Sequence, residues 1–550
     1  MRKKAASEPR REEILSNTWR QYEDGKNYKR QIGLYSTVRE NERFFRGDQW
    51  RGVDAGGLPT PVFNLVSRIG NYLVNSVMSY RTGISFIDDA LSFAGKGKRV
   101  EKITKELDLL NRFTDYRFKK MQMPKILRDA VTDALLTGDG VFYTYWDPSL
   151  KTGQPFKGDF RTVTVDNVDL FVADVNTADI QSQEYLILSG RATVRSLVKE
   201  GIEAGLSGED LRKILPDEVS EGSGDYSTTE NADRDAGKAT FLVKFYRDED
   251  GHVCFEKSVR QTLLYTVQTS MTRYPVAYFN WARTKGSFHG TSPVTELIPN
   301  QKYVNKAYAM VMKHMADTAF SKVIYDKKLI PEWTNEVGQA IGVVSGGDIR
   351  TAATTIGVGA MQTDCLTLIE QTIKQTKDLA GATEVALGET DPTNTSAIIA
   401  LREAAEQPLD AVRENLYRCL EDLANIWFEM MCEYYGSGRL FVGDGDESVG
   451  EIDFALLKSE EIRAVVDSGA SKRYSQVTLL NTLDMLLKEG HISFVQYLER
   501  LPDGVLQDKG RLLEEVRQGL TGNAAEVIPP AAVPAGTASP ARKEGSDHAG

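Results

Sequence analysis

The chain has 550 residues, of which 41% are hydrophobic and 26% are charged, and its formal net charge is −11. This length exceeds what one hydrophobic core usually organises, so we expect roughly two to four structural units. The composition is that of a globular protein. The acidic balance excludes a basic field over the whole protein for holding nucleic acid, and four scattered cysteines predict neither a disulfide framework nor a zinc cluster.

The N-terminal part predicts a series of helices. Charge and apolar spacing place them at about 11–30, 31–45, from Asn64 onward, 98–120 and 124–136. Asn64 is a good N-cap for the third of these helices. The last one ends at the TGDG turn, Thr137–Gly140, and the aromatic strand VFYTYW follows.

The next region, up to about Tyr278, is rich in strand-forming residues. The Asp250-Gly251 pair favours a hairpin turn, and we expect an exposed loop at Leu215–Lys238, where apolar residues are few. His252 and Cys254 share one face of a predicted strand. A half-buried strand face explains them more simply than a metal site does.

A third region alternates helices with short β-like and polar segments. Helical spacing covers 293–319 and 363–380, a β-like stretch separates them, and a polar loop at 381–396 precedes a long helix at 397–435. Pro408 interrupts this long helix, so we expect a kink there. Its apolar stripe is about one face wide, which predicts lateral packing on other helices. Its other faces carry an excess of acidic side chains, namely Glu403, Glu406, Asp410, Glu414, Glu421, Asp422, Glu429 and Glu433.

No known catalytic signature stands out. The sequence lacks a phosphate-binding loop with a Gly-Lys-Ser/Thr ending, a zinc-protease helix and a nucleophile elbow. His289 has two readings: a base beside Ser287 or Ser292, or a turn residue that caps the next helix. We favour the second, and predict no catalytic residue, no metal and no cofactor.

Three segments together resemble the portal proteins of tailed bacteriophages. The first is NERFFRGDQW (41–50), followed by a Pro-bearing loop and FNLVSRIGNYLVNSV. The second is ALLTGDGVFYTYWDP, and the third is GTSPVTELIPNQKYVNKAYAMVMKHM, which includes Gln301 and Asn305. The resemblance runs across most of residues 30–435 and is weak over the last 110 or so.

The resemblance implies an α+β, multi-domain subunit. Its parts map onto this chain as an N-terminal arm (1–30), an α/β wing (31–292), a first stem helix (293–319), a small α/β clip (320–362), a second stem helix (363–380), a tunnel loop (381–396), a long bridging helix (397–435), a return to the wing (436–473), a helical crown (474–525) and a disordered tail (526–550).

The resemblance also implies a structural role without enzymatic activity. Portal proteins form a homo-oligomeric ring, expected to be a dodecamer, at one capsid vertex of the virion after assembly in the host cytoplasm. Double-stranded DNA passes through the ring non-specifically. The implied partners are the large terminase subunit (the packaging ATPase), the major capsid and scaffolding proteins and a head-tail adaptor, and no membrane is involved.

Two groups of residues are candidates for lining such a channel. The tunnel loop would contribute Gly388, Glu389, Thr390, Asp391, Thr393 and Asn394. The stem helices would contribute Lys302, Lys306, Lys313, Lys374 and Lys377, either as rings of positive charge or as partners in ion pairs between subunits. For Glu389 and Asp391 a solvated loop is the simpler reading, and an acidic wall facing DNA is the functional one.

Two alternatives remain. The chain could be another phage head-tail connector or scaffold protein, although connectors are usually much shorter. A metal-dependent nuclease that uses the scattered carboxylates is the third reading.

Overall fold

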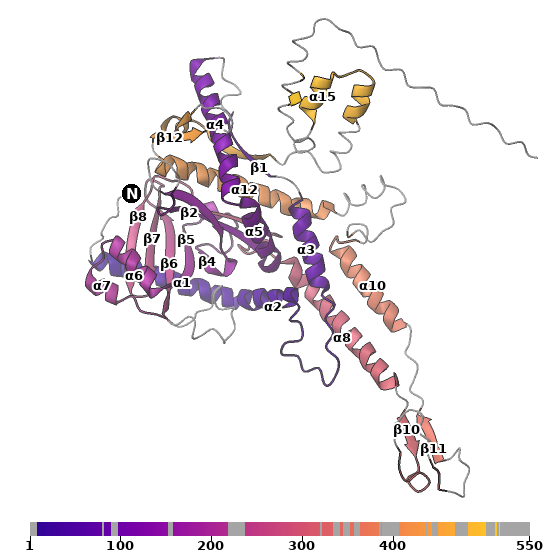
Figure 1. The fold of residues 1–550 in the computed structure, drawn as a ribbon. Helices are drawn as coiled ribbons and strands as arrows, with labels where there is room; N and C mark the ends of the chain where they lie inside the picture. The colour runs from indigo at the N-terminus through magenta and orange to yellow at the C-terminus, as the bar shows by residue number, and fades with distance from the viewer. Residues whose placement is uncertain are drawn as a thin grey trace, which may run out of the picture. The chain divides into compact units, whose positions relative to one another are not determined.

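The structure is a computed structural model. It describes residues 8–79, 82–89, 97–151, 158–217, 237–319, 322–333, 342–344, 352–356, 364–383, 387, 406–435, 437–442, 449–467, 482–501, 512–513 and 516. Contacts divide the chain into two units, Met1–Gly469 and Ala470–Gly550. The first unit combines helices with several separate sheets (Figure 1), which confirms the predicted α+β class. None of the described helices is long and apolar enough to cross a membrane.

Three helices open the described chain where the sequence predicts them. Gly33 separates α1 (Glu8–Gln31) from α2 (Leu34–Arg46), and its φ of 71° is a left-handed conformation that suits glycine. α3 (Leu65–Val77) begins after Asn64, whose side chain accepts the Ser67 amide at 3.0 Å. The predicted N-cap is therefore confirmed.

Two further helices lead into a small sheet. α4 (Lys98–Lys120) and α5 (Met123–Thr137) match their predicted ranges. α5 stops at Gly138, where the φ is 93° and a Cβ would lie 2.5 Å from the carbonyl oxygen of Gly290. The chain enters the sheet directly from this turn. The sheet is antiparallel, with the order β3 (Asp159–Thr164), β2 (Asp139–Asp147) and β9 (Val276–Asn280).

A second antiparallel sheet has five strands. In spatial order they are β4 (Leu170–Val172), β5 (Tyr185–Thr193), β6 (Lys238–Arg247), β7 (Val253–Val259) and β8 (Thr262–Gln268). The connections include η2 (Asn167–Asp169), η3 (Ile180–Ser182), α6 (Val194–Glu203) and α7 (Gly208–Arg212). Asp250-Gly251 lies in the β6–β7 turn, as predicted. Most of the loop expected at Leu215–Lys238 lies outside the described residues.

Helix α1 packs on one face of this five-stranded sheet (Figure 1). Trp19 and Tyr22 pack with Phe171, Ile187 and Leu242 in one apolar cluster. The ammonium of Lys29, near the end of α1, is buried. It donates to the carbonyl oxygens of Asn167, Val168 and Leu170 at 2.8, 2.9 and 2.5 Å.

The main core surrounds a long helix, α12 (Asp410–Tyr434). It packs on β9, β2 and β14, with α3 and α13 beside it. Its buried residues are Val412, Arg413, Leu416, Cys419, Leu420, Leu423, Ala424, Ile426, Trp427, Phe428, Met430 and Met431. The predicted packing on helices is only part of the arrangement, because strands as well as α3 and α13 contact this helix, and the prediction of a stripe one face wide is wrong.

The segment after α12 completes the core from a distance in sequence. β14 (Ile462–Asp467) pairs antiparallel with β1 (Gly83–Asp88), with Gly83 opposite Asp467. Before it lie β12 (Ser437–Val442), paired with β13 (Val449–Asp453), and the short α13 (Phe454–Leu457).

The second unit is described for only a few residues. Residues 482–488 are helical, and α15 (Phe494–Arg500) starts with a capping box between Ser493 and Gln496. The Tyr497 hydroxyl donates to Asp484 at 2.6 Å and joins the two helices. The predicted disordered tail at 526–550 lies outside the described residues.

Candidate functional site: a helix pair and its buried root

Two helices and a hairpin form the candidate functional site. α8 (Pro293–Ala319) and α10 (Asp364–Leu379) lie side by side, and the hairpin of β10 (Lys322–Tyr325) and β11 (Ala353–Ile356) lies between them in the chain (Figure 1). Both helices occur where the sequence predicts them. Parts of the connections, including 334–341 and 357–363, lie outside the described residues.

Burial falls along α8 from its first turns to its last. Val294, Gln301, Val304 and Ala309 are buried, whereas Met310 and Met315 are 56% and 60% exposed. The second helix also exposes apolar side chains. On α10, Leu366, Leu368 and Leu379 are 40%, 50% and 86% exposed. One half of α8 is therefore anchored in the core, while the other half and α10 present apolar side chains to solvent.

The anchor of α8 is a connected set of four buried or half-buried amides, which we call the amide junction: Gln49, Asn64, Gln301 and Asn305. Gln301 Oε1 accepts the amides of Leu65 and Val66 at 2.8 and 3.3 Å. Its Nε2 donates to the Phe63 carbonyl and to Asn305 Oδ1, both at 2.9 Å. Gln301 thereby satisfies the first two amides of α3, which have no partner within their own helix.

The amide junction continues into the first motif of the sequence. Asn305 Nδ2 donates to Gln49 Oε1 at 2.6 Å, and Gln49 Nε2 donates to the Phe44 carbonyl and to Asn64 Oδ1 at 3.0 and 3.2 Å. The two segments are more than two hundred residues apart in the chain. The first and third motifs are thus halves of one hydrogen-bonded structure.

A second set of bonds holds the start of α8 on α2 and α5. Asn41 Nδ2 donates to the Leu136 carbonyl at 2.7 Å and to Thr295 Oγ1 at 2.9 Å. The Ser292 hydroxyl donates to the Leu135 carbonyl at 2.5 Å. The end of α5, which carries the second motif, is therefore hydrogen-bonded to the buried first half of α8.

Asp139, in the TGDG turn, is the centre of a fully buried polar cluster. Its carboxylate accepts bonds from Asn167 and Asn280 (2.9 Å each), the Tyr278 hydroxyl and the Gly290 amide (2.8 Å each), and it contacts His289 Nδ1 at 2.7 Å. Burial by itself would raise the pKa of Asp139. The charge and hydrogen bond of His289, with the bonds from Asn167 and Gly290, outweigh burial and hold that pKa below its ordinary value.

This geometry explains His289 as a structural residue. The Ser287 hydroxyl donates to the carbonyl oxygen of His289, and that of Ser292 donates to Leu135. His289 neither activates a serine hydroxyl nor caps α8 in the described bonds, so its expected capping role is wrong. Its imidazole instead holds the carboxylate that joins β2, β9 and the loop before α8.

His252 precedes β7 and only Cys254 lies in that strand, so the prediction that both share a strand face is wrong. Asp248, Asp250 and His252 offer ligand atoms within 4.8 Å of one another. Asp248 Oδ1 already accepts the amides of Asp250 and His252, and its Oδ2 accepts Gln268 Nε2 at 2.7 Å. These bonds are those of a carboxylate that stabilises the β6–β7 turn.

The five stem lysines fall into three classes. Lys302 pairs with Glu40 at 2.7 Å, and Lys313 pairs with Asp317 at 3.6 Å, both within the chain. Lys377 is buried in the last turn of α10, so it fits a channel wall least. Lys306 and Lys374 are exposed and have no ionic partner among the described residues.

The other predicted site residues receive less support. Gly388, Glu389, Thr390, Asp391, Thr393 and Asn394 lie outside the described residues. Pro408 is exposed in a 3-10 turn, η6 (Gln407–Leu409), that leads directly into α12. Because residues 388–405 before it are not described, the predicted kink stays a prediction.

The acidic side chains of α12 are engaged with the rest of the fold. Glu429 accepts the amides of Thr272 and Arg273 at 2.7 and 3.1 Å, and Glu433 accepts the Ser270 hydroxyl. The other contacts within the chain are Glu406 and Asp410 with Arg413, Glu414 with Arg418, Glu421 with the Val466 amide and Asp422 with Arg273. Glu403 lies outside the described residues. Asp410 and Glu414 remain 61% and 65% exposed, and both pair with arginines of α12 itself.

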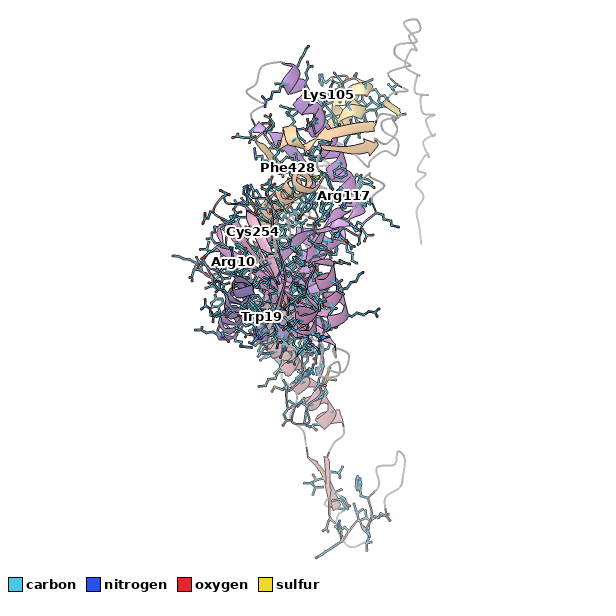
Figure 2. The ribbon with its side chains drawn as sticks, turned by 90° about the vertical axis from the view of Figure 1, so that its left-hand side faces the viewer. Arg10, Trp19, Lys105, Arg117, Cys254 and Phe428 are labelled. Atoms are coloured by element: carbon cyan, nitrogen blue, oxygen red, sulfur yellow. The ribbon has the colours of Figure 1, made fainter. Side chains whose placement is uncertain are left out.

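Sequence reasoning missed a buried ion pair beneath α12. Arg117 Nη1 lies 2.7 Å from Asp159, and the two side chains are 4% and 0% exposed. Figure 2 labels Arg117 among the side chains of the first unit. The Tyr435 hydroxyl also donates to Asp159, at 2.6 Å. The available signal was the position of Arg117, one step after Ile103, Leu107, Leu110 and Thr114 on the buried face of α4.

Residues 238–449 match the family model of the P22-like phage portal proteins. The match covers β6 to the start of β13, and so includes the helix pair, its hairpin and α12. This confirms the predicted resemblance to phage portal proteins, and the third motif lies within the matched range while the first two precede it. No curated protein matches the chain.

Proposed function

We propose, on the premise that residues 238–449 resemble a P22-like portal protein, that this chain forms the ring-shaped portal at one vertex of a phage capsid. In this role it is structural and not enzymatic. Double-stranded DNA is packaged and ejected through the ring, and a separate ATPase supplies the energy. The family match carries the proposal, since it spans the whole helix pair.

The exposed apolar side chains of the helix pair support assembly into a ring. Met310, Met315 and Leu379 are at least half exposed in the single chain. Contiguous exposed apolar surface on a globular protein commonly marks a contact with another molecule. Side-by-side packing of α8 and α10 from neighbouring copies buries these residues, and the proposed ring is a dodecamer.

The proposed parts of the subunit follow the structure. α8 (Pro293–Ala319) and α10 (Asp364–Leu379) are the stem helices, and the β10–β11 hairpin belongs to the clip, on which the large terminase subunit and later a head-tail adaptor dock. In this proposal α12 bridges back to the wing, and residues 474–525 are the crown. The capsid and scaffolding proteins surround the ring in the virion.

The channel wall needs weak and reversible contact with DNA. Each phosphate neutralised by a lysine adds an affinity that grows as the salt concentration falls. Lys306 and Lys374 are the stem lysines that are exposed and unpaired among the described residues, so we propose them, with the loop at 388–394, as channel residues. Two isolated cations in each copy attract the duplex without holding it.

Electron microscopy of the purified full-length chain tests this function. Negatively stained particles are expected to be rings with a central hole and about twelve-fold symmetry. A clean monomer at high concentration contradicts the proposal. Cleavage of DNA with Mg²⁺ or Mn²⁺ that a single Asp or Glu substitution abolishes favours the nuclease reading instead. Rings that lack portal stoichiometry and do not associate with capsid protein favour a connector.

A further inference from the structure

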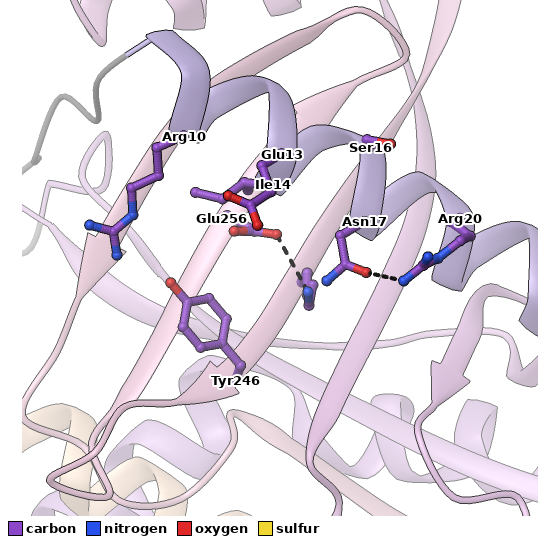
Figure 3. A pocket seen from close by; sticks show the side chains of 9 residues that line it. Arg10, Glu13, Ile14, Ser16, Asn17, Arg20, Tyr246 and Glu256 are labelled. Atoms are coloured by element: carbon purple, nitrogen blue, oxygen red, sulfur yellow. Dashed lines mark hydrogen bonds and ion pairs between the residues drawn. The ribbon is translucent and has the colours of Figure 1, made fainter.

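A polar groove lies between α1 and the face of the five-stranded sheet on which α1 packs (Figure 3). It has a volume of about 580 Å³. Its lining from α1 includes Arg10, Glu13, Asn17 and Arg20, and its floor is formed by Lys244, Tyr246 and Glu256 of β6 and β7. The groove is far in sequence from the helix pair, and the portal function proposed above makes no use of it.

The floor of the groove holds the ammonium group of Lys244, which has few polar contacts. Lys244 is 9% exposed, and the nearest acidic atom, Glu256 Oε1, is 3.9 Å from its Nζ. That separation is longer than a hydrogen bond. Among the described residues no acceptor bonds to this ammonium, which otherwise faces the Tyr185 and Tyr246 rings at 5.5 and 5.8 Å. Lys244 lines the groove, so a bound acceptor could satisfy the N–H groups of its ammonium.

Glu256 forms an ion pair with Lys244 at 3.9 Å but no hydrogen bond to it. It accepts the hydroxyl of Thr18 from α1. The next residue in the cross-strand row, Thr266, lies opposite Glu256, and its buried hydroxyl has no partner among the described residues. The interface between α1 and the sheet therefore has unused donors next to the groove.

The charge of the groove selects the kind of ligand. Arg10, Arg20 and Lys244 are cationic, whereas Glu13 and Glu256 are acidic, so the excess is one positive charge. A single carboxylate balances this excess, while the two acidic side chains repel a phosphate dianion. In Figure 3, the Arg10 guanidinium and the Tyr246 ring lie over the same part of the groove.

The shape of the groove favours a peptide. The lining residues of α1 run from Arg10 to Arg20, a rise of roughly 15 Å along a helix. An extended chain covers that length in about four or five residues.

We propose that this groove binds an acidic side chain, an aspartate or glutamate, in an extended segment of a partner protein. Lys244 and Arg10 bind the carboxylate and the Tyr246 hydroxyl donates to it. The bound carboxylate supplies the acceptor that the Lys244 ammonium lacks within the described chain. A charge-assisted hydrogen bond is among the stronger polar contacts.

A blocked pentapeptide, acetyl-Ala-Ala-Asp-Ala-Ala-amide, is the probe. Saturation-transfer NMR with the full-length protein is expected to show millimolar binding, and the Asn analogue is expected to bind at least about tenfold more weakly. The substitution Lys244→Met should weaken binding of the Asp peptide by a similar factor. Lys257→Met is the matched control, because Lys257 lies on the opposite face of the same sheet and pairs with Glu200 at 2.8 Å.

Three outcomes overturn the proposal: equal binding of the Asp and Asn peptides, unchanged binding to Lys244→Met, or displacement of the peptide by inorganic phosphate at lower concentration than by acetate. Retained binding to Lys257→Met, within about twofold, supports it. If Lys244→Met does not fold, Arg10→Gln decides the question, since Arg10 lines the groove but is itself exposed, and the substitution should weaken binding about threefold. Ring formation is measured separately, so failure here leaves the portal proposal intact.

Discussion

Helices α8 and α12 have nearly the same length, 27 and 25 residues, but opposite surroundings. α12 is covered by strands and packed around Trp427, which is fully buried, and its acidic side chains bind other parts of the chain. α8 is buried only in its first half, and beyond Ala309 it exposes methionines. One helix is complete within the single chain, whereas the other leaves apolar surface for further contacts.

This difference separates the part of the chain whose contacts stabilise the fold from the part whose surface is available for contacts with other molecules. The buried polar groups, from the amide junction to the Arg117–Asp159 pair, lie around α12 and the first half of α8. Substitutions in this buried part should lower the free energy of unfolding of the chain. Substitutions on the exposed part should change association while leaving the stability of the chain nearly unaltered.

Breaking the buried ion pair should give the largest effect. Arg117→Met leaves the Asp159 carboxylate buried without its cation, and also removes the bond from Arg117 Nη2 to the Phe160 carbonyl (2.7 Å). We expect a loss of about 3–5 kcal/mol in the free energy of unfolding, measured by denaturant titration. The double substitution Arg117→Met with Asp159→Asn should recover part of this loss. A loss below about 1 kcal/mol for the single change contradicts the assignment.

The amide junction should give the next largest effect. Gln301→Leu leaves the amide of Val66 without its partner and removes one of two bonds from the Leu65 amide and from the Phe63 carbonyl, which still bond each other at 2.8 Å. We expect a loss of about 1–3 kcal/mol. Hydrogen exchange should increase in α8 and at the start of α3 more than in α12. Lys306→Gln, one turn further on an exposed position, is the control and should change stability by less than about 0.5 kcal/mol. An equal increase in hydrogen exchange in all three helices contradicts a local role for the amide junction.

The sequence was sufficient for the helices but not for their surroundings. Apolar spacing and caps such as Asn64 located α3, α4, α5, α8 and α10 closely, because these signals are local. The partners of Gln301 and Arg117 were invisible, since they lie on segments that meet only in the folded chain. For the same reason the contacts of the α12 carboxylates were not predicted, because a glutamate on a helix face has the same local pattern whether it faces solvent or, like Glu429, accepts the amides of a distant loop.

The acidic side chains around Asp133 predict that the free energy of unfolding depends on pH. Burial, with the nearby Asp166, Asp129 and Glu42, raises the pKa of Asp133 on α5 to about 7. Between about pH 4 and 7 the folded chain keeps a proton that the unfolded chain releases, so this group loses its stabilising contribution as the pH rises through that window. In Asp133→Asn, the free energy of unfolding should fall by about 2–4 kcal/mol less between pH 4 and 8 than it does in the original chain. Thermal unfolding in a buffer series measures it, and an unchanged slope contradicts the assignment.

Substitutions in the exposed half of α8 should change self-association and leave the free energy of unfolding nearly unaltered. Met310→Ser with Met315→Ser removes apolar surface that is already in contact with water, so the stability of the chain should change by less than about 0.5 kcal/mol. Self-association should weaken, because burial of each methionine contributes about 1.5–3 kcal/mol at an interface. Sedimentation velocity compares the variants at equal concentration. The matched control is Met485→Ser, half exposed in the second unit, and rings that survive the α8 change unaltered place the contact elsewhere.

Substitution of Pro408 should give the smallest effect on stability. It tests whether the turn before α12 supports that helix. Pro408 lies in the first turn of η6, where a helical amide has no partner within the helix, so the missing N–H of proline costs little there. Pro408→Ala should therefore change the free energy of unfolding by less than about 1 kcal/mol. If the predicted kink positions the loop before it, packaging of DNA into particles should fall more than ring assembly does. Equal loss of assembly and packaging means that the proline has an architectural role alone, and a stability loss of several kcal/mol means that its turn supports α12 itself.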